Sequence, residues 1–147
     1  MNNDIMIDSS LLVEYVKKTR MSLLNRLIND SSATCYINET VVSEFLFYHL
    51  KLNSAASPRS AKSSNRIKSI IESTSDYNLL YLFHFLSTDK KIYGLAPQFM
   101  SQYNILPNDA IILATCKIHG IVKLASHDSD FIIPCQQEGI ELVTETE

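Results

Sequence analysis

The chain has 147 residues, enough for one domain with a sizeable core, and its 46% hydrophobic and 20% charged content is that of an ordinary globular protein. The formal net charge of −3 excludes global basicity as a basis for nucleic-acid binding, so a phosphate partner requires a local basic patch or a metal ion. No apolar run approaches the roughly 20 residues that span a bilayer, and the N-terminus lacks the pattern of a signal peptide. We expect one domain over residues 1–147 and no membrane partner.

Three cysteines, Cys35, Cys116 and Cys135, lie far apart and beside apolar residues. Their odd number and the absence of a C-x-x-C pair argue against a disulfide framework and against a cysteine metal site. We therefore expect reduced thiols in the core of a cytoplasmic protein.

The start of the chain has the pattern of the opening β-α unit of a parallel sheet. Residues 4–8 form a short apolar run that ends in Asp8. The next two residues, Ser9 and Ser10, are good caps for a helix over residues 11–18.

The second unit repeats this pattern after a further helix, which is predicted over residues 21–29. A strand is expected at residues 34–37, and Asn38 can cap a helix over residues 39–52. At 100° per residue, one side of that helix is apolar. It comprises Val41, Val42, Phe45, Leu46, His49 and Leu52.

Three residues stand out on the helix over residues 39–52. Glu44 falls at the margin of the apolar side, so its carboxylate is expected to be neither fully buried nor free in solvent. Phe47 falls on the opposite side, where an exposed aromatic ring indicates a partner surface. His49 is expected to be packed or hydrogen-bonded structure.

The middle of the chain is less regular. Residues 53–65 are rich in serine and alanine, contain Pro58, and form the clearest predicted loop. A helix over residues 66–72 follows. Four cations of this segment could bind a phosphate backbone or form a solvated surface, and the sequence leaves both open. They are Arg59, Lys62, Arg66 and Lys68.

A strand is expected near residues 83–86, and the segment before it could be helical. Residues 89–103 indicate a helix opened by Thr88, with Gly94 and Pro97 favouring a break or kink.

The last third has the clearest pattern. Pro107 suits the first position of a helix over residues 107–119 and Gly120 suits its end, while Asp109 lies in the first turn. A buried strand over residues 121–125 runs into an acidic turn.

That acidic turn carries Asp128 and Asp130, and residues 131–133 are expected to return to the core. A final strand covers residues 140–143. The alternation of strands and helices predicts an α/β fold, a three-layer α/β/α domain with a mainly parallel central sheet.

Five carboxylates follow predicted strands, open a predicted helix or, for Glu44, lie in the helix after the second strand: Asp8, Glu44, Asp109, Asp128 and Asp130. Residues just after the carboxyl ends of parallel strands gather at one edge of a sheet. Carboxylates gathered there repel one another unless a cation neutralises them, and hard oxygen ligands select Mg²⁺ or Mn²⁺. Such a site can bind a phosphodiester and activate water. The alternative is a scatter of ordinary surface acids.

Four segments in this order resemble the PIN-domain ribonucleases, in particular the VapC-type toxins. They are Ile7-Asp8-Ser9-Ser10, Val42-Ser43-Glu44-Phe45, the run from Leu106 to Ala114, and Ser126-His127-Asp128-Ser129-Asp130-Phe131. The resemblance covers nearly the whole chain. It implies a PIN-like fold, Mg²⁺- or Mn²⁺-dependent endoribonuclease activity, a homodimer, and often a small antitoxin that blocks the site.

Carried over by position, the resemblance implies catalytic and metal-binding roles for four acids: Asp8, Glu44, Asp109 and Asp128. Asp130 is a further candidate metal ligand at the second acidic position of the last motif. Ser10 and Ser126 match hydroxyl positions that orient the carboxylates.

The expected reaction is RNA cleavage by metal-activated water, with the basic group of residues 59–68 as possible RNA contacts. His127, beside Asp128, is expected to be a solvent-facing turn residue. The segment of residues 53–81 is longer and richer in serine than in many compact toxins.

Two other function classes are open. The chain could be a catalytically silent PIN-like module that binds a protein partner or RNA, which the exposed Phe47 and the basic loop would favour. A phosphoryl-transfer domain with an acid after its first strand is disfavoured, because Asp8-Ser9-Ser10 lacks the second aspartate that such domains carry two residues on.

Overall fold

A five-stranded parallel sheet separates two layers of helices in the computed structural model, which describes residues 3–145. The strand order is β3-β2-β1-β4-β5, and each neighbouring pair is parallel. The strands are β1 (Asp4–Ile7), β2 (Thr34–Asn38), β3 (His84–Leu86), β4 (Lys123–Ala125) and β5 (Glu141–Val143). The ends of the predicted domain, residues 1–2 and 146–147, lie outside the described part.

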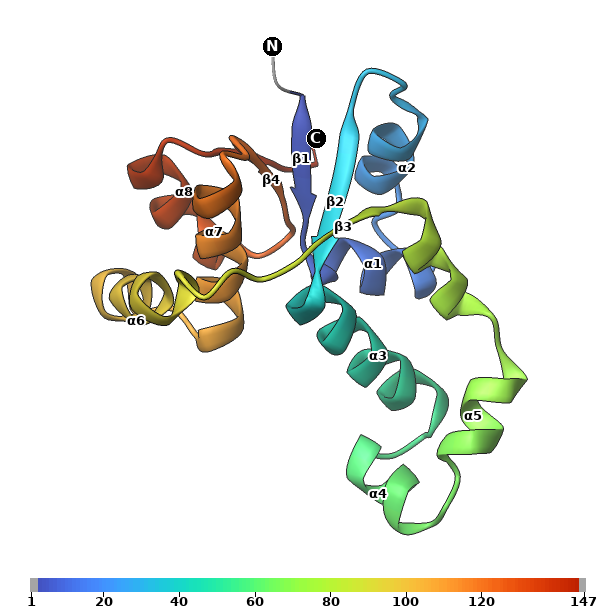
Figure 1. Cartoon of the computed structure of the whole chain (residues 1–147). Coiled ribbons are helices and arrows are strands. Elements are labelled where there is room, and N and C mark those ends of the chain that lie inside the picture. Colours follow the sequence, from blue (N-terminus) through green and yellow to red (C-terminus); the bar gives the residue numbers. More distant parts are fainter. Residues whose placement is uncertain (1–2, 146–147) are drawn as a thin grey trace.

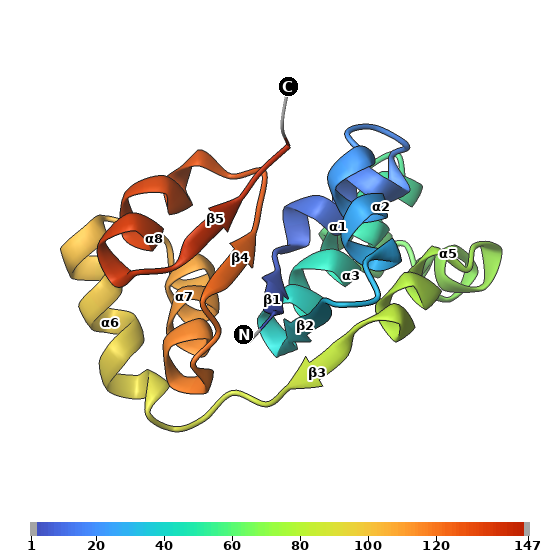
Figure 2. The ribbon, with the colours of Figure 1, turned by 90° about the horizontal axis from the view of Figure 1, so that it is seen from above.

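Helices cover both faces of this sheet (Figures 1 and 2). On one side lie α1 (Ser9–Val16), α2 (Ser22–Asn29) and the start of α3 (Glu39–Asn53). On the other lie α6 (Ile92–Tyr103), α7 (Pro107–His119) and α8 (Ile132–Glu138). The predicted three-layer α/β/α architecture is confirmed, and the sheet is parallel throughout.

The core sits where β1 and β4 pair at the centre of the sheet. Met6, Ile7, Leu124 and Ala125 are each 0% exposed. Strands buried on both faces carry continuous apolar runs, which is why these two segments were recognisable as strands. Across residues 3–145, no helix has the length and apolarity needed to cross a membrane.

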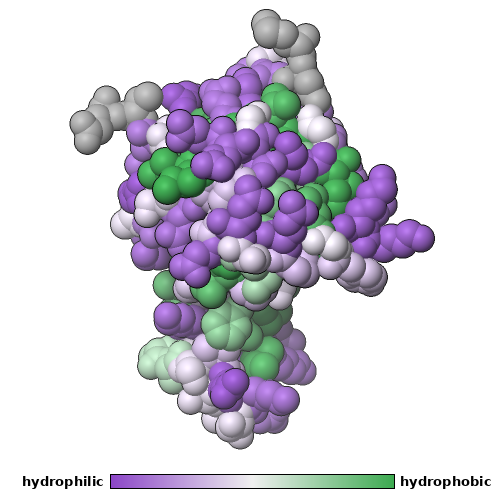
Figure 3. All heavy atoms as spheres, turned by 90° about the vertical axis from the view of Figure 1, so that its left-hand side faces the viewer, coloured by the Kyte–Doolittle hydropathy of each residue, from purple (hydrophilic) through white to green (hydrophobic). Residues whose placement is uncertain are grey.

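The segment of residues 54–75, called the arm below, projects from the sheet domain beyond the end of α3 (Figures 1 and 3). It contains two short helices, α4 (Pro58–Ser63) and α5 (Ile67–Ser73). A 3-10 helix, η1 (Asp76–Leu82), leads back to β3. In Figure 3 the lower part of the molecule, where α3 leads into the arm, forms a narrow lobe with hydrophobic residues showing on its surface.

The prediction of a loop over residues 53–65 was wrong, because this stretch holds α4. Ser57 caps that helix by accepting a hydrogen bond from the Ser60 amide at 3.1 Å, and Pro58 occupies its first position. Both are standard helix-start signals, but six residues are too few to show a periodic apolar side.

The start of α1 also differs from the prediction. Ser9 and Ser10 lie inside the helix, and the cap is Asp8, whose carboxylate accepts from the Ser10 amide. Aspartate is as good a cap as serine, so only Asp8 separates the end of β1 from the start of α1.

Three further details of the predicted helices were wrong. Helix α6 begins at Ile92, not at residue 89. Thr88 does not cap this helix, because its amide and hydroxyl donate hydrogen bonds to the Glu39 carboxylate. This helix continues through Gly94 and Pro97. The carbonyl that Pro97 cannot bond belongs to Tyr93, which is 82% exposed and can be hydrated.

The residues after the acidic turn form a helix that the sequence reading missed. Phe131 is fully buried, but Ile132 and Ile133 begin α8 and are 54% and 61% exposed. On α3, Leu46 and Leu52 are also exposed, at 37% and 43%, so the predicted apolar side of this helix is only partly buried.

Candidate functional site

Asp8 ends β1 at the carboxyl edge of the sheet and is 4% exposed. Its Oδ2 atom accepts hydrogen bonds from the Ser10 hydroxyl at 2.5 Å and from the Ser126 hydroxyl at 2.7 Å. Ile7 pairs with Ala125 across the two central strands, so Asp8 and Ser126 are brought together by the register of the sheet. The hydrogen bonds from Ser10 and Ser126 to Asp8 therefore support the expected role of both serines in orienting its carboxylate.

The same hydroxyls connect Asp8 to the acidic turn. Ser10 Oγ accepts from the His127 amide at 3.0 Å, and Ser126 Oγ accepts from the Asp128 amide at 2.9 Å. Because these hydroxyls serve both segments, the start of α1 and the turn after β4 are held in one fixed relation.

Glu44 reaches this edge from the second turn of α3. Its two carboxylate oxygens accept from Ser9 Oγ at 2.8 Å and from Asn108 Nδ2 at 2.9 Å. Neither donor was predicted from the sequence to contact Glu44. The only signals were their positions next to Asp8 and Asp109, since the donors lie 35 and 64 residues from Glu44 along the chain.

Asp109 lies in the first turn of α7 and is half-buried. Burial, and after it the charges of the other four candidate acids, raise the pKa of its carboxyl to about 7. From the largest effect to the smallest, those acids are Asp8, Asp128, Glu44 and Asp130. The charges of the other four acids therefore all act on Asp109, which the charges of scattered surface acids would not do.

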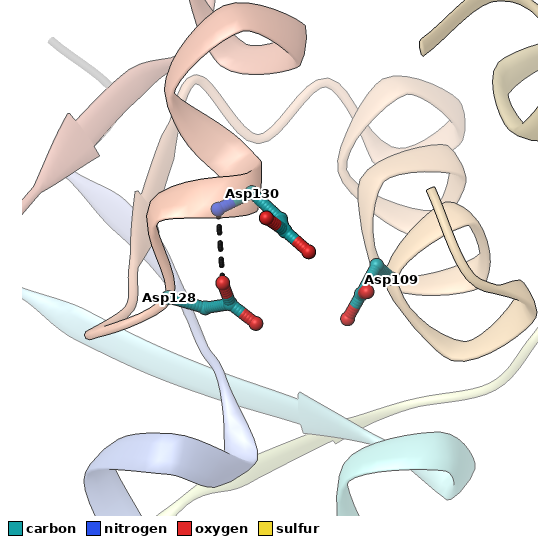
Figure 4. Close-up of side chains that lie close together, drawn as sticks. All are labelled: Asp109, Asp128 and Asp130. Carbon is teal, nitrogen blue, oxygen red and sulfur yellow. Dashed lines mark hydrogen bonds between the residues drawn. The ribbon is translucent and has the colours of Figure 1, made fainter. Parts of the chain in front are cut away.

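Asp109, Asp128 and Asp130 each offer a carboxylate oxygen, and these three atoms lie within 4.8 Å of one another (Figure 4). Asp128 Oδ1 accepts from the Asp130 amide at 2.9 Å, which fixes the turn that carries both residues. Oxygen ligands at this spacing suit a hard divalent cation such as Mg²⁺ or Mn²⁺.

This close trio does not include Asp8 or Glu44, whose carboxylates are oriented by hydroxyl and amide donors. Both nevertheless line the same cavity as Asp109 and Asp128, with a volume of about 530 Å³. The structure thus brings the five predicted acids to one edge, with three of them close enough to share a single ion.

The cavity also has a basic side. Lys17 and Arg20, from the end of α1 and the turn after it, line it together with Tyr48 from α3. The sequence reading missed both cations, because nothing in their spacing links them to the acids. The four predicted arm cations do not line this cavity, and their contact with RNA stays a prediction.

His127 was wrongly expected to face solvent. It is half-buried, and neither ring nitrogen has a hydrogen-bond partner among the described residues. Burial and the nearby Arg20 charge lower the pKa of His127. His49 is packed as expected, with its ring 6.4 Å from that of Phe45 and 6.1 Å from that of Tyr77.

The sequence of this chain is similar to those of known proteins. The chain is 36% identical over 141 residues to Ribonuclease VapC6 of Methanocaldococcus jannaschii, a match that covers 88% of this chain and 91% of that protein. It is 28% identical over 130 residues to Ribonuclease VapC2 of the same organism, over 88% of this chain and 87% of the relative.

A solved structure described as a toxin-antitoxin complex from Klebsiella pneumoniae has the same fold, with a TM-score of 0.61 at 19% identity. The match covers 97% of this chain and 98% of that one. The model of the PIN domain matches residues 5–134. This chain belongs to the PIN domain family.

Proposed function

We propose that this chain is a divalent-metal-dependent endoribonuclease and the toxin of a toxin–antitoxin pair. The observation that carries the proposal is the trio of Asp109, Asp128 and Asp130 oxygens within 4.8 Å, beside the oriented carboxylates of Asp8 and Glu44. Membership of the PIN family and two relatives named as ribonucleases support the same activity.

The chain's own residues divide the work at this edge. Asp109, Asp128 and Asp130 hold a Mg²⁺ or Mn²⁺ ion, and Asp8 and Glu44 complete its negative surroundings. A bound ion of this kind supplies Lewis-acid stabilisation of charge on a phosphoryl group and lowers the pKa of water.

The remaining contacts keep the acids ready. Ser10 and Ser126 hold the Asp8 carboxylate in one orientation, as Ser9 and Asn108 hold that of Glu44. Because the pKa of Asp109 is raised to about 7, its carboxyl retains a proton over part of the neutral range, and a bound cation would favour the ionised form.

Partners follow from the same assignment. The substrate is RNA, a small antitoxin protein covers the site, and the chain forms a homodimer. The acids and the cavity occupy one edge of the sheet, where a small partner could block all of them at once.

A catalytically silent binding module is the second candidate. It is favoured by the exposed aromatic residues of α3, Phe47 at 54% and Tyr48 at 39%, which offer an apolar surface beside the cavity.

Cleavage of a single-stranded RNA with Mn²⁺, with Mg²⁺ and with EDTA tests the first proposal. We expect cleavage only with a divalent ion, and its loss in Asp8→Asn and Asp109→Asn. Asp76→Asn, an exposed aspartate of η1, is the matched control and should cleave normally.

Activity that survives EDTA, or full activity in Asp109→Asn, would overturn the nuclease assignment. Calorimetry separates the second candidate, since a silent module should show no heat of Mn²⁺ binding that depends on Asp109.

A further inference from the structure

The two cations that line the cavity are both paired with carboxylates of the same chain. Lys17 Nζ lies 2.9 Å from Glu14 Oε1, and Arg20 Nε lies 3.4 Å from Glu145 Oε2. Glu145 is also held by the Ser22 hydroxyl at 2.7 Å. Each cation therefore faces the cavity with a negative group already bound to it.

Both pairs are accessible to solvent. The side chains of Lys17 and Arg20 are 41% and 51% exposed, and those of Glu14 and Glu145 are 22% and 23% exposed. Exposed ion pairs contribute little to stability, so a better anion can displace the carboxylates easily. A phosphate is such an anion, because the Arg20 guanidinium can bind two of its oxygens at once.

These cations lie next to the acidic edge. The Arg20 charge acts on the His127 ring, and the His127 amide donates to Ser10 Oγ, the hydroxyl that orients Asp8. Asp128 is the residue that follows His127. A nucleic acid strand with one phosphate at the carboxylates can therefore reach Arg20 with a neighbouring phosphate.

The negative charge of this edge makes a positively charged side chain necessary for binding an RNA strand. Five carboxylates gather at the edge, and the chain as a whole carries a net charge of −3. The local negative charge of the carboxylates and the net charge of the chain both repel an RNA backbone, and one divalent ion neutralises only part of this charge. Among the residues that line the cavity, Lys17 and Arg20 are the groups of lasting positive charge.

We propose that Lys17 and Arg20 bind a phosphate adjacent to the one cleaved, and that Glu14 and Glu145 occupy these cations until RNA displaces them. This inference rests on the proposed ribonuclease function and names the substrate contact and its intramolecular competitor. Glu145 thereby sets RNA affinity without touching the reacting phosphate.

Binding of a fluorescent single-stranded RNA to the full chain tests this, with every variant carrying Asp109→Asn so that the RNA stays intact. Lys17→Gln and Arg20→Gln are each expected to weaken binding several-fold at moderate salt. Each should also lower the slope of log affinity against log salt by about 0.7, the value for one lost phosphate contact on a single strand.

Glu145→Gln provides the sharper readout. It is expected to tighten binding about three-fold, because Arg20 no longer has to be released from its partner. In the Arg20→Gln background the same change should have no effect. Glu72→Gln is the matched control, because it removes a carboxylate from the Lys68–Glu72 pair of the arm, outside the cavity.

Unchanged salt slopes in Lys17→Gln and Arg20→Gln would overturn the inference, as would tightening by Glu145→Gln that persists without Arg20. Failure of the nuclease proposal would look different. A chain that binds RNA through Arg20 but never cleaves it keeps the phosphate site and loses the proposed reaction. If the chain cleaves RNA with Mn²⁺ while these variants bind RNA normally, the proposed reaction stands and the proposed phosphate site is wrong.

Discussion

The carboxyl edge of the sheet and the arm of residues 54–75 differ in what holds their side chains. At the edge, Asp8 is 4% exposed, Ser126 is fully buried, and hydrogen bonds connect segments more than one hundred residues apart. In the arm, the buried residues are Ser54, Ala61 and Ile70, and most hydrogen bonds join near neighbours. Contacts between distant segments thus hold the carboxylates at the edge, while the arm is held mostly by local hydrogen bonds.

The largest expected contrast concerns large-to-small changes in the two regions. Phe131→Ala should lower the free energy of unfolding by about 3–5 kcal/mol, because Phe131 is fully buried behind the acidic turn. Ile70→Ala in α5 should cost only about 2 kcal/mol, since the thin arm can close around the lost volume. Urea unfolding followed by circular dichroism measures both.

The rate of RNA cleavage at low urea concentration gives a second comparison of the same two variants. Phe131→Ala should also reduce activity, because Phe131 supports the turn that carries Asp128 and Asp130, whereas Ile70→Ala should not. Equal losses of stability with no loss of activity in either variant would contradict the contrast.

Hydroxyl deletions come next. Ser126→Ala removes a donor from Asp8 and should lower metal affinity or activity by about 10- to 100-fold. Ser57→Ala removes the cap of α4 and should leave activity unchanged. Titration of cleavage rate against Mn²⁺ concentration measures the effect, and normal Mn²⁺ dependence in Ser126→Ala would count against an orienting role.

The raised pKa of Asp109 makes stability depend on pH when no ion is bound. The folded chain binds a proton at Asp109 that the unfolded chain has already lost between about pH 4 and pH 7, so this residue lowers stability as pH rises through that range. At pH 7.5 in EDTA, Asp109→Asn should stabilise by about 1–2 kcal/mol, discounted for solvent screening of a half-buried group.

Thermal unfolding measures this gain as roughly 3–6 °C in Tm. It should shrink as the pH falls and vanish at about pH 3, below the ordinary pKa of 3.8, where the wild-type carboxyl is protonated in both states. It should reverse with saturating Mn²⁺, which binds the wild-type site. Asp76→Asn in η1 is the control and should show none of these changes.

The smallest effect lies in the arm. Ser57→Ala should cost about 1 kcal/mol of local helix stability through loss of the N-cap. Hydrogen exchange should then quicken in α4 but not in β1 or β4, because the arm opens without global unfolding. Faster exchange of β1 in the same variant would show that the two regions are coupled.

Those two regions also differ in how far the sequence predicts them. The acids could be predicted because β1 and β4 are continuous apolar runs that end in Asp8 and near Asp128, and the ends of parallel strands converge. Strong start and stop residues likewise made α7 predictable over its full length, from Pro107 to Gly120.

What could not be predicted depends on tertiary contacts. Asn108 and Ser9 bind Glu44 only after three helices have packed, and Arg20 reaches the cavity through a turn in which its φ is 43°. Short helices such as α4 and α8 lack enough turns for a periodic signal. That residues 1–147 act as one domain stays a prediction.

The strand order has a consequence for synthesis of the protein. Strand β1 is made first but lies at the centre of the sheet, and its neighbour β4 is made more than one hundred residues later. Asp8 therefore cannot contact Ser126, or lie near Asp128 and Asp130, until the ribosome has synthesised those residues. Under the proposed function, the nascent chain has no complete site for RNA cleavage until late in its own translation.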